Sequence, residues 1–157
     1  ERVGGTVVQL TTGDKGSYLY LTCGAPVSHE DDVYRCASAA LHLSKAPDVM
    51  SFISSVNIGL GYGTALTGAY GSSRRRTYGA LGEQTNFAAR LMGVAAAGSV
   101  LASEAFVKEA ADEYDFAQLE PVVLKGRSEA VKVFELVGRK GSPASTTRST
   151  DVATCTR

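Results

Sequence analysis

Two polar side chains on one predicted helix are the first candidates for chemistry. Residues 78–98 read YGALGEQTNFAARLMGVAAAG, in which Asn86 and Arg90 are four residues apart and therefore share a helix face. Phe87 and Leu91 form the apolar stripe beside them, so periodicity alone would make the polar pair a solvated surface. An amide next to a permanently charged guanidinium can also orient a sugar and stabilise charge on a phosphate. Spacing alone leaves both interpretations open.

The other polar clusters have simpler explanations. The sequence SHEDD at residues 28–32 looks like a metal cluster, but acidic residues in a first helical turn are also stabilised by the helix dipole. The run Arg74–Arg76 is typical of a solvated loop, with a phosphate or partner role as the alternative. Neither a P-loop nor a GxGxxG motif occurs, which excludes the usual phosphate cradles. Cys23 and Cys36 form no C-x-x-C pair, and we expect them to be buried.

Composition narrows the class of protein. The 157 residues are 44% hydrophobic, enough for one domain with a core. The 16 basic and 16 acidic residues cancel, so no electrostatic footprint for nucleic acid or an acidic membrane is visible. No apolar run reaches the roughly 18 to 20 residues that span a bilayer. We therefore expect a cytoplasmic protein with no nucleic-acid partner and no membrane span in this segment.

The elements that must position the polar pair alternate between strands and helices. Turn residues GDKG join two β-branched runs into a hairpin, and glycines punctuate the later strands. This pattern predicts an α+β fold with helices on one face of a sheet, in one domain over residues 1–138. Residues 139–157 lose the apolar pattern, and we expect a disordered tail. The predicted strands are 6–12, 17–23, 56–62, 65–70, 77–81, 99–102 and two within 122–137; the predicted helices are 31–45, 83–94 and 103–111.

The order of these motifs resembles a known family. GGTVV is followed by GAPVSHEDD leading a helix, then by NIGLGYGTALTGAYGSSRRRTYGALGEQTNFAARL and LKGRSEAVKVFEL. Over about residues 4–137 this resembles the class III adenylyl/guanylyl cyclase catalytic domain, and DKGSYLYLTCGAP resembles the soluble-adenylyl-cyclase branch. The resemblance implies a ferredoxin-like cyclase fold that is N-terminally truncated, without the first strand and the helices that follow it.

The resemblance also implies roles for individual residues. In the family two domains meet head to tail and the nucleotide lies between them. Asn86 matches the ribose-positioning Asn, Arg90 the Arg that stabilises the pentavalent phosphorus, and Lys125, more weakly, the triphosphate-binding Lys. Gln9 aligns with the adenine-reading Lys, and Gly79 with the Asp or Thr that partners it. These matches are those of a second-type, or C2-like, half of the site.

Metal binding departs from the family pattern. The resemblance implies Mg or Mn ions held by two aspartates, one of them on the absent first strand. Ser17 stands where the second aspartate is usual, and Asp14 lies three residues too early, so it is a doubtful ligand. We therefore expect the partner domain to hold the metal ions.

Two functions remain open. The first is a half-domain that pairs with a second cyclase domain, in the same or another chain, and forms cyclic AMP and pyrophosphate from ATP in intracellular signal transduction, with GTP as the alternative substrate. The alternative is a catalytically degenerate module with a regulatory or dimer-scaffold role.

Overall fold

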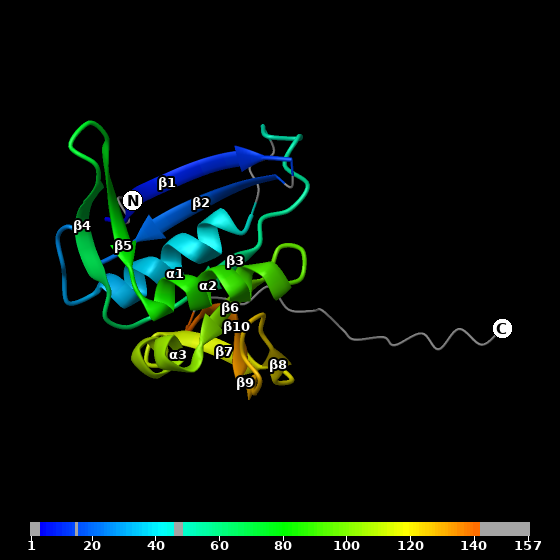
Figure 1. Ribbon diagram of the computed structural model, residues 1–157. Helices are drawn as coiled ribbons and strands as arrows, with labels where there is room; N and C mark the ends of the chain where they lie inside the picture. The colour runs from blue at the N-terminus through cyan, green and yellow to red at the C-terminus, as the bar shows by residue number, and fades with distance from the viewer. Residues whose placement is uncertain (1–3, 15, 46–48, 142–157) are drawn as a thin grey trace.

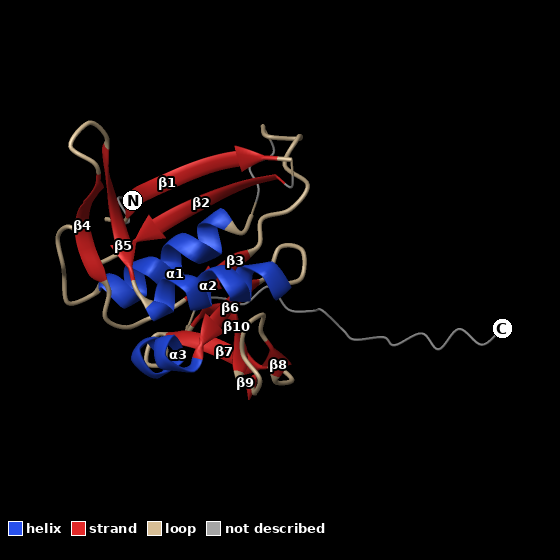
Figure 2. Ribbon diagram, in the orientation of Figure 1, coloured by secondary structure: helices blue, strands red, loops and turns tan. Residues whose placement is uncertain are grey.

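The computed structural model describes residues 4–14, 16–45 and 49–141, which form a mixed α+β fold (Figures 1 and 2). The helices are α1 (Asp32–Leu43), α2 (Glu83–Val94) and α3 (Glu104–Ala110). The strands are β1 (Thr6–Gly13), β2 (Gly16–Thr22), β3 (Ile58–Leu60), β4 (Leu66–Gly71), β5 (Arg76–Leu81), β6 (Val100–Ser103), β7 (Tyr114–Gln118), β8 (Val122–Val123), β9 (Ala130–Val131) and β10 (Val133–Arg139). No helix in these ranges combines the length and the apolarity needed to cross a membrane.

A four-stranded sheet in the order β3-β6-β10-β7 forms the centre of the molecule. β3 runs parallel to β6, and β10 pairs antiparallel with both β6 and β7. Successive residues of β6 point to opposite faces. Val100 and Ala102 join a core cluster with residues of α1 and α3, whereas Leu101 joins a second cluster with residues of α2. The prediction that helices cover only one face is therefore wrong for this sheet, because β6 carries apolar residues on both faces and each face needs cover.

Two hairpins lie outside this sheet. β1 pairs antiparallel with β2, as predicted, and β4 pairs antiparallel with β5, a pairing that the sequence analysis did not specify. The Tyr20 hydroxyl, on β2, lies 3.2 Å from the Ala80 carbonyl oxygen and 3.0 Å from Thr85 Oγ1. This contact fastens the β1–β2 hairpin to the end of β5 and the first turn of α2. Figure 1 shows the end of β2 next to β5.

Glycines on and after β3 let α2 lie directly on the strand. A Cβ atom built on Gly59 would overlap the Ala88 carbonyl oxygen and lie 2.7 Å from the Met92 nitrogen. One built on Gly61 would lie 2.7 Å from the Gln84 carbonyl oxygen. These glycines permit a close backbone approach, which fixes how far α2 stands from the sheet.

The C-terminal third differs from the sequence prediction in its pairing. Ser103 accepts a hydrogen bond from the Phe106 N–H and caps α3, as predicted. The sequence analysis did not predict β7, because β7 pairs with β10, which lies further along the chain, and packs through a contact of Phe116 with Phe106 of α3. In the described part of the chain β8 pairs with the short β9, whereas the long strand of this region, β10, pairs with β6 and β7. The tail expected to be disordered lies, apart from residues 139–141, outside the described residues.

Candidate functional site

The site is built on α2. This helix buries Phe87 and Leu91 against the second core cluster, which also contains Leu101 of β6. Asn86 is exposed and Arg90 is partly exposed, one helical turn apart. The buried stripe thus turns the polar pair away from the core, as the periodicity predicted.

A loop between β8 and β9 docks on the same helix. Leu124 is 1% exposed and packs in the cluster that contains Phe87. The Arg127 guanidinium lies 5.3 Å from the Phe87 ring centroid and forms an ion pair with Glu83 at the start of α2. Sequence reasoning did not identify this role of Arg127, because helix periodicity carries no signal for a contact 40 residues away in the chain.

The loop brings Gly126, the residue after Lys125, close to Arg90. A Cβ atom built on Gly126 would lie 3.5 Å from Arg90 Nη2, so the guanidinium sits against this glycine, whose φ is +80°. Lys125 precedes Gly126 and is exposed. Among the described residues, the ion pairs involve neither Arg90 nor Lys125. Within the described part of the chain, Arg90 and Lys125 therefore have no acidic partner, while the neighbouring Arg127 is paired with Glu83.

The two candidate base-reading positions also come near each other. Gln9 lies opposite Tyr20 in the β1–β2 ladder, is exposed, and donates a hydrogen bond of 2.9 Å to Thr11 Oγ1. Gly79 is buried on β5, next to the Ala80 that Tyr20 contacts. β1 and β5 contact each other as well. One neighbourhood of the fold thus contains both positions.

Asp14 lies in the turn of the β1–β2 hairpin, at the end remote from β5, and is exposed (Figure 1). Among the described residues there is no group of three or more His, Cys, Asp or Glu side chains that could hold a metal ion. The side chains of this part of the chain therefore do not fit a self-sufficient metal site, and SHEDD does not form one.

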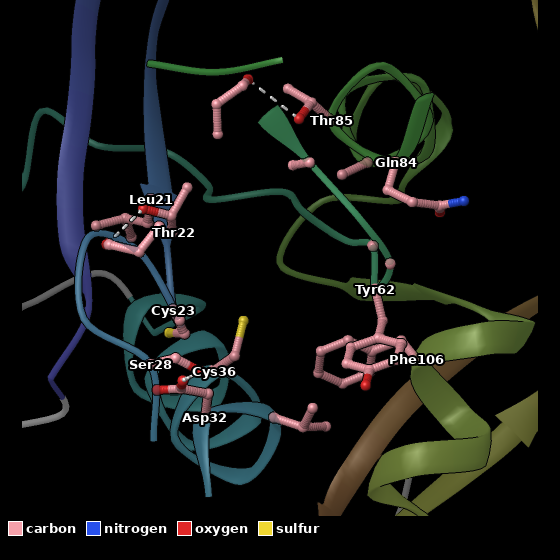
Figure 3. A pocket seen from close by; sticks show the side chains of 18 of the residues that line it. Leu21, Thr22, Cys23, Ser28, Asp32, Cys36, Tyr62, Gln84, Thr85 and Phe106 are labelled. Carbon is pink, nitrogen blue, oxygen red and sulfur yellow. Dashed lines mark hydrogen bonds between the residues drawn. The ribbon is translucent and has the colours of Figure 1, made fainter. Parts of the chain in front are cut away.

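A cavity of about 460 Å³ lies between β2, α1 and α2. Figure 3 shows Cys23, Cys36 and Asp32 on one side of it and Tyr62 on the other. β2 pairs only with β1 and β3 only with β6 in the described part of the chain, so each has a free edge in this region. The cavity is lined by none of the candidate residues Asn86, Arg90, Lys125, Gln9, Gly79 and Asp14. It is distinct from the candidate site.

The two cysteines at this cavity have different acidities. Both are reduced, and a hydrogen bond from the Cys36 thiol lowers the pKa of Cys23. The same hydrogen bond, together with burial, raises the pKa of Cys36 well above its usual value. The expected burial is confirmed in part, because each residue keeps some exposed surface.

We expect iodoacetamide at pH 8 to alkylate Cys23 before Cys36, because the thiolate is the nucleophile and Cys23 ionises at the lower pH. The Cys36→Ala variant should slow the alkylation of Cys23, since the pKa of Cys23 rises when its donor is removed. Peptide mass spectrometry over time measures both rates. Equal rates at the two wild-type cysteines would contradict the assignment.

Comparison with known proteins identifies the family of this fold and site. The family model described as "Adenylate and Guanylate cyclase catalytic domain" matches residues 10–138. The chain belongs to this family. The cyclase domain is also 33% identical over 144 residues to Adenylate cyclase 1 of Rhizobium meliloti (strain 1021), a match that covers 85% of this chain and 21% of that protein. The chain thus spans about a fifth of the length of this curated relative.

Solved structures share the fold of this cyclase domain. The adenylyl cyclase CyaB from P. aeruginosa superposes with a TM-score of 0.75 at 21% identity, covering 87% of this chain and 73% of that one. The guanylate cyclase domain of RhGC from Catenaria anguillulae, solved in complex with GTP, gives a TM-score of 0.71 at 24% identity, covering 88% and 75%. These likenesses confirm the α+β cyclase fold, and the 157 residues are shorter than the solved domains.

Proposed function

We propose that this chain is a second-type half of a class III cyclase of the soluble-adenylyl-cyclase branch, which forms cyclic AMP and pyrophosphate from ATP at an interface with another cyclase domain. The observation that supports it most is the position of Arg90 against Gly126, with Lys125 next in the chain and neither cation in an ion pair among the described residues. Cations that no described acidic side chain neutralises are available to an anionic ligand, and a polyphosphate carries the complementary charge.

In this proposal each residue acts on a defined part of the nucleotide. The ribose 3′-oxygen forms a bond to the α-phosphorus, the bond from that phosphorus to the pyrophosphate oxygen breaks, and the 3′-hydroxyl proton is released. Arg90 stabilises the charge that develops on the α-phosphate. Asn86 holds the ribose so that the 3′-oxygen lies in line. Lys125 binds the triphosphate.

The remaining parts of the site come from the partner. Mg or Mn ions, which would supply Lewis-acid stabilisation of the phosphates, are proposed to be held mainly by the partner domain, because the described residues gather no ligand cluster. We propose that the domain spans residues 1–138, acts in the cytoplasm, and pairs with a second cyclase domain in the same or another chain.

Two observations favour the alternative, a degenerate module that regulates or scaffolds a cyclase dimer. Asp14 is isolated in a hairpin turn, and Gly79 offers no side chain to a base. A module of this kind would retain the fold and the pairing surface without turnover.

A mixing assay separates the two functions. Cyclic nucleotide production from ATP and from GTP, with Mg²⁺ or Mn²⁺, is measured for this chain alone and after mixing with a metal-competent first-type cyclase domain. We expect activity only in the mixture, since neither half carries the complete site. If the mixture forms no cyclic nucleotide although analytical ultracentrifugation shows that the two domains pair, the catalytic proposal is overturned and the regulatory module is supported.

A further inference from the structure

The ring of Tyr70 occupies the space in which a side chain at position 79 would lie. A Cβ atom built on Gly79 would overlap Cε1 of Tyr70 and lie 3.1 Å from its Cζ. Tyr70 pairs with Thr77 across the β4–β5 ladder, and Gly79 is two residues further along the same strand. The two positions are therefore diagonal neighbours on one face of the hairpin. Gly79 is buried on a largely exposed hairpin because the tyrosine covers it.

Tyr70 itself remains open to solvent. Its side chain is 44% exposed. The hydroxyls of Tyr20 and Tyr114 are hydrogen-bonded to the Ala80 and Tyr34 carbonyl oxygens, whereas no hydrogen bond within the described ranges engages the hydroxyl of Tyr70. A large aromatic ring with an unused hydroxyl thus stands where position 79 has no side chain.

We propose that Tyr70 supplies the purine contact that position 79 cannot make, so that the base is read by a residue of β4 in place of one of β5. This inference rests on the proposed function, in which position 79 belongs to the base-reading pair with Gln9. The fastening of the β1–β2 hairpin to β5 by Tyr20 brings Gln9 to the same neighbourhood.

The chemistry of the pair predicts its selectivity. A phenol hydroxyl both donates and accepts, and a glutamine amide does the same through its nitrogen and oxygen. Adenine presents a donor amine beside an acceptor ring nitrogen, and guanine presents an acceptor carbonyl beside a donor ring N–H. Two adaptable groups can satisfy either edge, so Tyr70 and Gln9 should bind both purines and discriminate weakly between ATP and GTP.

The test uses the full chain paired with a metal-competent cyclase domain. Steady-state KM is measured for ATP and GTP, and Kd is measured by calorimetry for 3′-deoxy-ATP and 3′-deoxy-GTP, which cannot cyclise. Tyr70→Phe should raise KM and Kd about fivefold for both purines, the size of one lost hydrogen bond, with kcat unchanged. The control Tyr18→Phe removes the hydroxyl of a tyrosine that is also exposed, at 45%, on β2, and should change neither constant.

Exchanging the large and small residues at positions 70 and 79 tests whether their side chains occupy the same space. Gly79→Thr alone should raise KM about tenfold, since its side chain meets the Tyr70 ring, and Tyr70→Ala alone should do the same. The double variant Tyr70→Ala with Gly79→Thr should return KM to within about threefold of wild type, because a hydroxyl then occupies the vacated space. Additive effects of the two changes would overturn the inference.

The two proposals fail in different ways. If turnover depends on Arg90 but Tyr70→Phe changes neither KM nor Kd, the role of Tyr70 is overturned and the proposed cyclase function is retained. If Tyr70→Phe weakens the binding of 3′-deoxy-ATP but no turnover of ATP is found, the proposed reaction is overturned and the purine contact is supported. Absence of binding of both analogues would overturn both.

Discussion

Replacing Arg90 by alanine is expected to lower kcat of the paired enzyme by about 10²- to 10³-fold, as for the loss of one preorganised charge-stabilising donor. Arg90 Nη2 lies beside Gly126 rather than in an ion pair of the described residues, so its charge is available to a developing phosphate charge. KM should change little, since the interaction strengthens in the transition state. Initial rates of cyclic AMP formation at several ATP concentrations measure both constants.

The control is Arg139→Ala, which removes an equal charge from an exposed residue that is already paired with Glu113 at 2.7 Å. This variant should keep kcat within about twofold of wild type, because surface ion pairs contribute little. Arg90→Ala should also keep its melting temperature and its pairing with the partner domain. A kcat within threefold of wild type for Arg90→Ala would exclude the proposed role.

Substituting Gly59 by alanine is expected to have the largest effect on stability, lowering the free energy of unfolding by roughly 3 kcal/mol, the upper part of the usual range for overpacking. Its new Cβ would overlap the Ala88 carbonyl oxygen, which is backbone and can move only if the whole of α2 moves. The shift would carry Asn86 and Arg90 away from the Gly126 loop. Activity should therefore fall together with the urea midpoint of unfolding.

The chain offers a matched control within α2. A Cβ atom built on Gly93 meets no atom within 4 Å, and Gly93 is the penultimate residue of α2. Gly93→Ala should raise the free energy of unfolding by up to about 0.5 kcal/mol, because alanine loses less backbone entropy on folding and the position lies in the last turn of the helix. If Gly59→Ala were as stable as Gly93→Ala, the close packing of β3 on α2 would be refuted.

The sequence predicted α2 and its polar pair well, for a local reason. Phe87 and Leu91 recur at helical spacing, which determines both the helix at residues 83–94 and the face that carries Asn86 and Arg90. The cap of α3 at Ser103 and the β1–β2 hairpin follow equally local rules of turn and cap chemistry. Glycines inside a strand are typical of either a bulge or a close backbone approach, and they could not indicate that α2 approaches β3.

Contacts between segments distant in the sequence determined the parts of the fold and the site that the sequence did not predict. Nothing in the spacing of LKGR indicates that Leu124 and Arg127 dock on Phe87 and so place Gly126 against Arg90. The burial of β6 on both faces and the pairing of β7 with β10 also depend on segments far apart in the chain.

The sequence by itself determined the order of elements, the helix that carries Asn86 and Arg90, and the family to which the domain belongs. Only the tertiary structure decided that Gly79 is covered by Tyr70 and that Arg90 lies against Gly126. The physical reason is the separation along the chain of the residues that interact. Periodicity, caps and turns depend on residues within one or two helical turns of each other. The residues that form a site depend instead on which segments, distant in the sequence, pack together and exclude water.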